Sequence, residues 1–246
     1  MLGPSMKALT ETDIVLELED LWNKYFDVVP AVTTQLLDQV FALRYQVYCV
    51  EHQFEDPAKY PTHREHDVFD AVSQHIALSY RISGEVVGTC RLIFPSDAAP
   101  TALPIMSLLG ADARAELQAY PIDEMAEISR YIVSKAFRRR RGEDEFPDVG
   151  YSPFDVESAR RLMPHLTLGL IQGLLQLVSS GQVRYFCASM RPSLLRLLGQ
   201  LGLKFKTVGP LVNHHGLRQP CIAAVSDLLL GLKRWAVDSK IKKQTA

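Results

Sequence analysis

The sequence predicts an α/β protein in which helices cover both faces of a central mixed β-sheet. Two observations lead to this fold class. Segments with an apolar period of two alternate, though not strictly, with segments in which apolar residues recur every three or four positions, the spacing of amphipathic helices. No repeat, low-complexity run or glycine-rich linker interrupts the 246 residues, so we expect a single domain over 1–246 with its core in 20–237.

The first third of the chain predicts an edge strand, a helix, a long polar loop and a hairpin. Pro30 ends the strand, because proline has no N–H for a ladder bond. Thr33 or Thr34 caps the helix, and Arg44 lies on its apolar stripe. The hairpin turns at Ser83-Gly84. The expected limits are 25–30 for the strand, 34–48 for the helix, 51–65 for the loop, and 74–82 and 85–94 for the hairpin.

The remaining two thirds predict strands and helices after an irregular connection over 96–123, which holds an apolar segment (103–109) and a helical patch (112–119). Pro164 is tolerated in the first turn of one helix, and Pro192 opens another that Gly202 closes. The expected strands are 125–133, 183–190, 203–208 and 221–225, with a loop over 209–220. The expected helices are one with an apolar stripe over 162–177 that begins near Pro164 and ends at Gly181, and those over 194–201 and 227–237.

Composition excludes several function classes. The chain has 27 basic and 28 acidic residues, a net charge of -1, so it has no global field to hold nucleic acid. The apolar run 166–178 is too short to cross a bilayer, and the N-terminus lacks a signal-peptide layout, so we expect a cytoplasmic protein without a transmembrane segment. The four cysteines form no C-x-x-C pair and suit a core, and the histidines lack an H-E-x-x-H pairing, so no metal is expected.

Six charged residues lie among apolar neighbours, where an unpaired charge is costly. They are three cations, Arg44, Arg91 and Arg130, and three anions, Asp67, Asp70 and Glu127. Either they form an internal salt-bridge network that only orients the elements, or they converge in one cleft as a hydrogen-bonded active site. We predict that the six residues converge in one cleft.

The spacing of Glu127 and Arg130 predicts a β-bulge. An odd separation places the two side chains on opposite faces of a regular strand. One extra residue would bring them to the same face and would free backbone N–H groups to hold a substrate carbonyl.

Four linked motifs follow one another along the chain. They are Arg44-x-x-Val47-Tyr48, Glu65-x-Asp67-x-Phe69-Asp70, Val86-Val87-Gly88-Thr89-Cys90-Arg91-Leu92 and Glu127-Ile128-Ser129-Arg130-Tyr131. In order and spacing they resemble the autoinducer (acyl-homoserine-lactone) synthases. This resemblance implies the GNAT-like acyl-CoA N-acyltransferase fold, and it matches the six charged residues to invariant positions of that family. Tyr48 and Phe54 stand where those synthases carry a Phe and the Trp of the S-adenosylmethionine site.

The C-terminal third adds a second resemblance. Its segments Met190–Leu195 and His214–Cys221 resemble the N-acyl amino acid synthases, and most of all the acyltransferases associated with PEP-CTERM and exosortase systems. The implied function is transfer of a long fatty acyl chain from acyl carrier protein to the amine of an amino acid or related small molecule. The alternatives are an acyl-homoserine-lactone synthase using S-adenosylmethionine, and a non-catalytic domain that binds acyl carrier protein.

The resemblance and the chemistry of amide formation give each candidate residue an expected role. Glu127 is the candidate base, because an ammonium must lose a proton before it attacks a thioester. Acyl carrier protein or acyl-CoA is the co-substrate, and no bound cofactor is expected. The catalytic candidates are Glu127, Arg130 and Ser129, and the substrate-binding candidates are Arg44, Tyr48, Phe54, Asp67, Asp70 and Arg91.

The remaining candidates concern the two ends of the substrate. Arg91 and Arg130 are expected to clamp an acceptor carboxylate, with the loop 209–220 closing over it and His214-His215 either touching substrate or lying on the surface. Ile128, Ile132, Val133 and Ser134 are the candidates for the acyl-pantetheine arm. Leu103, Leu108, Ile128 and Phe186 either line an acyl slot or are plain core, and Arg138, Arg139, Arg140 and Arg141 either dock the carrier protein or form a solvated face.

Overall fold

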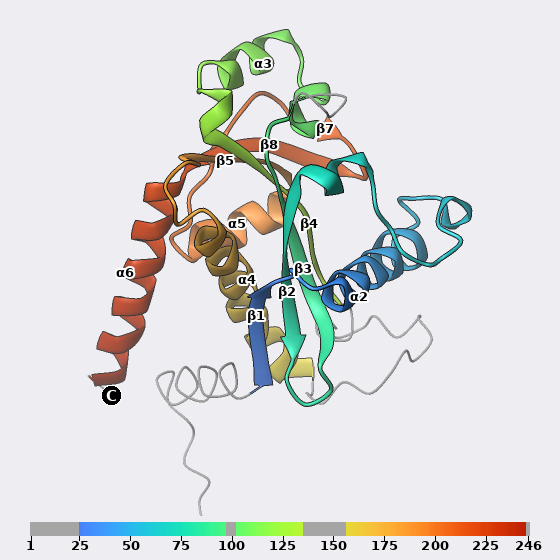
Figure 1. The fold of residues 1–246 in the computed structure, drawn as a ribbon. Coiled ribbons are helices and arrows are strands. Elements are labelled where there is room, and N and C mark those ends of the chain that lie inside the picture. Colours follow the sequence, from blue (N-terminus) through green and yellow to red (C-terminus); the bar gives the residue numbers. More distant parts are fainter. Residues whose placement is uncertain (1–24, 97–101, 135–155, 245–246) are drawn as a thin grey trace, which may run out of the picture.

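A computed structural model describes residues 25–96, 102–134 and 156–244 of the chain, with side chains over 25–96, 102–134 and 164–235 (Figure 1). Eight strands of these residues form one sheet, in the order β1-β2-β3-β4-β5-β8-β6, with β7 paired to β8. Only β4 and β5 are parallel, so the predicted mixed sheet is confirmed. The strands are β1 Phe26–Pro30, β2 Ser73–Tyr80, β3 Glu85–Ile93, β4 Met125–Val133, β5 Tyr185–Met190, β6 Lys206–Thr207, β7 Val212–Asn213 and β8 Leu217–Ala224.

Helices cover both faces of the sheet, as predicted (Figure 1). On one face α2 (Thr34–Tyr45) packs Val40 against β2 and β3, and α3 (Ala111–Gln118) packs near the chain segment before β4. On the other face lie α4 (Val156–Leu177), α5 (Pro192–Gln200) and α6 (Val225–Gln244). None of the described helices combines the length and apolar character needed to cross a lipid bilayer.

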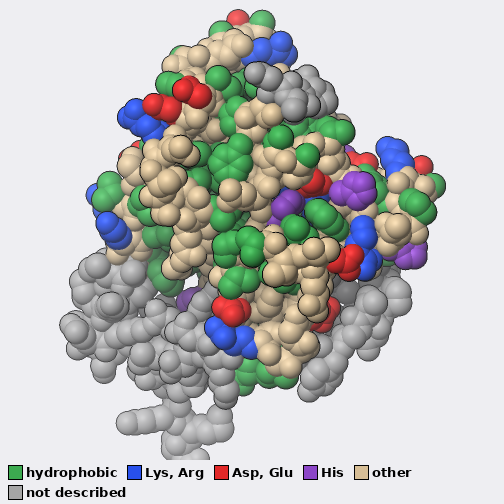
Figure 2. Space-filling view, viewed as in Figure 1, with side chains coloured by type: hydrophobic (Ala, Val, Ile, Leu, Met, Phe, Trp, Pro, Cys, Tyr) green, Lys and Arg blue, Asp and Glu red, His purple; other side chains and the backbone are tan. Residues whose placement is uncertain are grey.

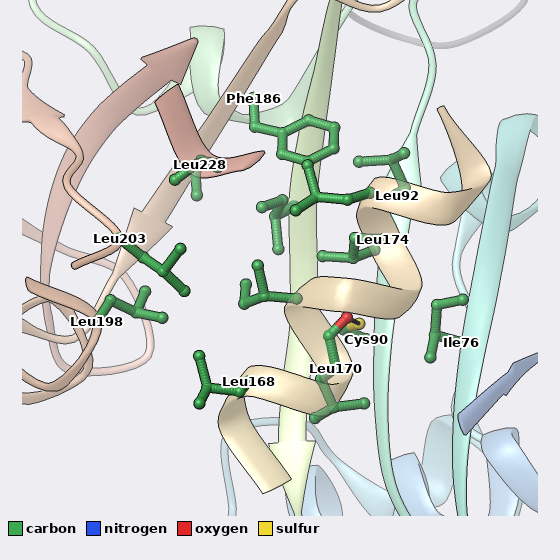
Figure 3. Packing of buried hydrophobic residues seen from close by; sticks show 14 of the residues in the cluster. Ile76, Cys90, Leu92, Leu168, Leu170, Leu174, Phe186, Leu198, Leu203 and Leu228 are labelled. Atoms are coloured by element: carbon green, nitrogen blue, oxygen red, sulfur yellow. Dashed lines mark hydrogen bonds between the residues drawn. The ribbon is translucent and has the colours of Figure 1, made fainter. Parts of the chain in front are cut away.

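The larger core lies between α4 and the middle of the sheet (Figure 3). Leu170 and Leu174 of α4 pack there with Cys90 and Leu92 of β3, and all four are fully buried. The helix approaches the sheet most closely at Gly173, where an added Cβ would lie 2.9 Å from Val28 Cγ1. A small residue is therefore required where α4 crosses β1 and β2.

The sheet opens between β4 and β5. These two strands pair only from Met125 to Ile128 and from Tyr185 to Ala188, although both continue beyond those residues. The sheet therefore splays next to the strand of Glu127, which leaves the second half of β4 without a partner on this edge.

The limits of several predicted elements differ in the structure. The helix α4 begins at Val156, so Pro164 lies inside it and removes one helical hydrogen bond instead of occupying the first turn. The N–H of Leu203 donates to Leu198 O (2.8 Å) and caps α5, so strand β6 begins at Lys206 and not at the predicted residue 203. The last paired segment, β8, begins in the predicted loop because it pairs with both β5 and the short strand β7.

Candidate active site

A bulge in β4 shapes the site. Arg91 pairs with Ser129 and Thr89 pairs with Ile132, so β4 has one residue more than β3 between these pairs. Arg130 lies in the bulge with a φ of 49°, in the left-handed region. Its guanidinium reaches Asp67, which Arg91 also contacts, so Ser129 and Arg130 share one face of the sheet. The predicted bulge is confirmed.

Arg91 joins the bulge to two aspartates. Its Nη1 donates to Asp67 Oδ1 at 2.6 Å and to Asp70 Oδ1 at 2.7 Å, and its Nη2 donates to Asp67 Oδ2 at 3.0 Å. Its Nε donates to the hydroxyl of Ser129 at 2.9 Å. The aspartates are held by the short helix η3 (Val68–Val72), where Asp67 accepts from Phe69 N and Asp70 accepts from Asp67 N as a capping box.

Glu65 links the other two arginines. Arg44 Nε donates to Glu65 Oε2 at 2.5 Å, and Arg130 Nη2 donates to Glu65 Oε1 at 2.8 Å and to Asp67 Oδ2 at 3.0 Å. Arg44 also donates to both oxygens of Asp70, at 2.7 and 3.1 Å. The predicted network therefore forms, but its third anion is Glu65 and not Glu127.

Electrostatics keep this network ionised. Burial by itself raises the pKa of Glu65, but Arg44 and Arg130 outweigh it and lower that pKa to about 2. The pKa of Asp70 is likewise lowered, because Arg44 and Arg91 outweigh its burial. Three cations and three anions then cancel, which makes a rigid and neutral support behind β4.

Glu127 lies apart from the network. It is 4% exposed, and its Oε2 accepts the N–H of Ile105 at 2.7 Å, in η4 (Pro104–Ser107). Burial raises its pKa to about 8. The prediction that Glu127 is hydrogen-bonded to the arginines is therefore wrong. Glu127 shares a face of the sheet with Ser129, but it lies two residues earlier on β4, opposite Ile93, where its carboxylate accepts from Ile105.

A cleft of about 300 Å³ fills the opening between β4 and β5. One wall is β4 from Ile128 to Val133, and the other is the end of β5 with the first residues of α5. Of the predicted residues it is lined by Tyr48, Phe54, Ile128, Ser129, Arg130, Ile132 and Val133. Arg44, Asp67, Asp70 and Arg91 lie behind this cleft and do not line it.

Tyr48 reaches the cleft because the helix changes its period. The sequence predicts one regular helix to Tyr48, but α2 ends at Tyr45 and continues as a π-helix, η1, over Gln46–Glu51. A π-turn rotates the following side chains relative to the apolar stripe. Tyr48 then lies under Arg130, whose guanidinium carbon is 4.8 Å from the centre of the ring.

The arginine clamp predicted for a carboxylate is wrong. Arg91 is 1% exposed and does not line the cleft. Arg130 does line it, but its Nε and Nη2 already donate to Glu65 and Asp67. Both side chains are occupied by the protein's own carboxylates.

Other predicted contacts are changed by hydrogen bonds and burial. The N–H of Ser134 donates to Val87 O at 2.7 Å, so it is not available to a pantetheine amide. Leu103 and Phe186 are fully buried in two different core clusters, and neither they nor Leu108 lines the cleft. Only Ile128 of the predicted acyl slot does. Arg138–Arg141 lie outside the described residues.

Stacked rings cross the mouth of the cleft. Phe54 lies 5.2 Å from His215, with 8° between the ring planes, and 5.0 Å from His52. His214 stacks on His215 in turn. Burial, together with His214 and Arg130, lowers the pKa of His215 to about 4, so this ring is neutral at pH 7. The turn between β7 and β8 is thus held against the loop after η1 through His215, whereas His214 is exposed.

Two other surface features lie outside this cleft. Figure 2 shows histidine, acidic and basic side chains gathered at the right, over the region of α2 and the loop that follows it. Within the described residues, no three His, Cys, Asp or Glu side chains are placed to hold a metal ion. A larger hollow of about 840 Å³, lined by Met106, Arg114 and Tyr120 among others, has only one charged side chain.

Several residues in or behind this cleft were not among the residues predicted from the sequence. Glu65 could have been predicted from the sequence, because it begins the motif that contains Asp67 and Asp70. Ser189, at the end of β5, lines the cleft with a buried hydroxyl that has no hydrogen-bond partner among the described residues. Arg218 lies inside β8, and a correct start for that strand would have identified it as a charge in a strand.

Comparison with known proteins identifies the fold. The acetyltransferase (GNAT) domain family matches residues 43–146, and no curated protein matches the chain. The structure is similar to the AHL synthase LasI, with a TM-score of 0.56 at 14% identity over 84% of this chain and 93% of LasI. The fold is therefore the GNAT-like acyl-CoA N-acyltransferase fold, as the resemblance implied.

Two further structures represent both predicted functions. FeeM, an N-acyl amino acid synthase from uncultured soil microbes, has a TM-score of 0.55 at 16% identity over 84% of this chain and 96% of FeeM. BjaI, a CoA-dependent acyl-homoserine lactone synthase solved with SAM and isopentyl-CoA, has a TM-score of 0.57 at 19% identity over 86% of this chain and 89% of BjaI. Similarity at these identities shows the shared fold and does not choose between the two substrates.

Proposed function

We propose that this protein is an N-acyltransferase that moves a long fatty acyl chain from acyl carrier protein to the amine of an amino acid or related small molecule. The observation that carries the proposal is the cleft between β4 and β5, with a bulged strand on one side and a neutral charge network behind it. A thioester laid along β4 and an amine entering past Tyr48 would meet at the bulge.

The reaction needs one base and one set of hydrogen-bond donors. The amine nitrogen attacks the thioester carbon, the tetrahedral oxyanion collapses, the C–S bond breaks, and the thiolate leaves and takes up a proton. Backbone N–H groups of the bulged strand, on the edge that β5 does not cover, would donate to the oxyanion. No side-chain nucleophile is required.

Glu127 remains our proposed base, acting through water because it does not line the cleft. Its pKa of about 8 suits a group that accepts a proton near neutral pH. Ser129, with its hydroxyl fixed by Arg91, and Arg130, fixed by Glu65, would orient the acceptor between the base and the thioester.

The acyl-pantetheine arm would pair with the open edge of β4. Hydrogen-bonding groups alternate along a strand, and the N–H of Ser134 points to β3, so the N–H of Val133 points to the open edge. The cleft continues between α4 and α5 past Thr167, Leu194 and Leu197, which offers the acyl chain an apolar path. The tail would lie there rather than against Leu103 or Phe186.

Mass spectrometry of the reaction products tests the proposal. The purified protein receives acyl carrier protein loaded with several chain lengths, with a pool of amino acids in one vessel and S-adenosylmethionine in another. We expect N-acyl amino acids from the first vessel. An acyl-homoserine lactone from the second alone would establish the alternative function, and carrier-protein binding with no product in either would leave a non-catalytic binding domain.

A further inference from the structure

Two arginines line the acceptor end of the cleft, across from β4. Arg191 immediately precedes α5, and Arg218 is the second residue of β8. Their guanidinium carbons lie 5.8 and 5.9 Å from the centre of the Phe54 ring. Two segments distant in sequence thus bring two positive charges to one aromatic ring inside the cleft.

Neither arginine forms an ion pair or side-chain hydrogen bond with another described residue. The contrast within the chain is plain, since Arg44, Arg91 and Arg130 are each held by two carboxylates and even the exposed Arg64 makes a two-point pair with Asp38. Burial of the half-buried Arg218, followed by repulsion from Arg191, lowers the pKa of Arg218. Arg191 is exposed and Arg218 is half-buried, so the repulsion bears mainly on Arg218, and an anionic ligand between the two guanidinium groups would relieve it.

We propose that Arg191 and Arg218 form a carboxylate subsite that holds the acceptor by its α-carboxylate, with its amine directed toward the bulge of β4. The inference rests on the proposed acyl transfer and narrows its acceptor to an α-amino acid. Guanidinium groups bind a carboxylate through paired hydrogen bonds, and Ser193 in the first turn of α5 lines the same wall.

The position of the subsite favours the acceptor over the donor. In the sheet order, β8 is separated from β4 by β5, whereas the thioester would run along β4 itself. A phosphate of the donor's pantetheine arm would therefore lie on the other wall. S-adenosylmethionine also has an α-carboxylate, but its sulfonium would enter beside two unneutralised cations.

Matched acceptors test the subsite. Leucine is compared with 3-methylbutylamine, phenylalanine with phenethylamine, and S-adenosylmethionine with its decarboxylated form, because each pair differs only in the carboxylate. The variants are Arg191→Ala and Arg218→Ala. The control is Arg196→Ala, an exposed arginine of α5 that does not line the cleft.

We expect either cleft variant to raise the KM for the amino acid about 10- to 100-fold, the effect of losing a charged hydrogen bond. The KM for the matched amine and for the acyl carrier protein stays unchanged, as do all constants of Arg196→Ala. Equal losses for amino acid and amine, or a rise confined to the acyl donor, would overturn the subsite while leaving acyl transfer intact.

Calorimetric titration with the same amino acids, in the absence of donor, distinguishes a failure of the proposed acyl transfer from a failure of the carboxylate subsite. If no acyl transfer is found but Arg218→Ala weakens amino acid binding by the same factor, the proposed function fails and the subsite stands. If the wild type binds leucine or phenylalanine no more tightly than the matched amine, the subsite fails whatever the activity.

Discussion

The guanidinium of Arg44 and the carboxylate of Glu65 are both completely buried, and Nε and Oε2 lie 2.5 Å apart although 21 positions separate the two residues in sequence. Glu65 also holds Arg130, the residue in the bulge of β4. One carboxylate thereby ties the helix α2 to the strand that lines the cleft. An ion pair that does not line the cleft thus holds the strand that does.

Removing this carboxylate is expected to destabilise the protein strongly. Glu65→Ala leaves Arg44 and Arg130 short of a counter-ion in the core, which costs about 3–5 kcal/mol of unfolding free energy. Asp38→Ala is the matched control, because Asp38 makes a two-point pair with Arg64 on the surface and should cost about 1 kcal/mol or less. Urea unfolding measures both. Equal losses would show that the buried network is not structural.

Acid should lower the unfolding free energy of the wild type by protonating Glu65. The pKa of Glu65 is about 2 in the folded protein and near 4.5 ordinarily, so the unfolded chain takes up a proton first as pH falls. The stabilisation is complete above pH 4.5 and is lost between 4.5 and 2. In Glu65→Gln the unfolding free energy, followed by urea titration at several pH values, should fall less steeply over this window. An unchanged slope would contradict the lowered pKa.

Ionisation of Glu127 should lower the free energy of unfolding, whereas ionisation of Glu65 raises it. Its pKa is raised to about 8 in the folded protein, so between pH 4.5 and 8 the unfolded chain loses the proton before the folded one does. Its ionisation thus reduces stability as pH rises through this window. Glu127→Gln, which keeps an acceptor for Ile105 N–H, should gain stability relative to wild type as pH rises from 4.5 to 8 in thermal unfolding.

The same variant examines the proposed base. If Glu127 accepts the amine proton, kcat/KM of the wild type rises toward pH 8, and Glu127→Gln lowers kcat by about 10²- to 10⁴-fold. A variant with full kcat and an unchanged pH profile would leave Glu127 a purely structural residue.

The close approach of α4 to the sheet gives a packing prediction. In Gly173→Ala the new Cβ would meet Val28 and Ile76 at 2.9–3.0 Å, and we expect a loss of about 1–3 kcal/mol despite alanine's better helix propensity. Gly199 of α5 is the control, because nothing lies within 4 Å of an added Cβ. Gly199→Ala should stabilise by about 0.5–1 kcal/mol in the same thermal unfolding assay. A stable Gly173→Ala would refute the tight contact.

The arginine run gives the donor prediction. Replacing Arg138–Arg141 by alanine should raise KM for acyl carrier protein and spare kcat, because the run would attract an acidic carrier without touching the reacting atoms. The effect should shrink at high salt, where the charges are screened. Steady-state kinetics at two ionic strengths measure it. If the variant shows no salt dependence and acyl-CoA serves equally well, the run is a solvated face.

Local sequence determined most of the elements and the kind of residue that the site uses. Thr33 caps α2 as predicted, β4 has its predicted limits, and the odd spacing of Glu127 and Arg130 required the bulge that the strand contains. These features depend on residues a few positions apart, where side-chain period, capping and β-propensity act directly. Charges isolated in apolar segments also identified Arg44, Arg91 and Arg130 correctly as members of one buried network.

Only the tertiary structure decided which carboxylate each arginine meets and which cations are left without one. Glu65 displaced Glu127 from the network because the loop after α2 brings Glu65 to both Arg44 and Arg130. Glu127 lies on the same face of the sheet but two residues before Ser129, where it accepts from Ile105. Arg191 and Arg218 become neighbours because α5 follows β5 and β8 pairs beside it. Ion pairing falls steeply with distance in space and not with separation in sequence, so these assignments depended on the packing of the sheet.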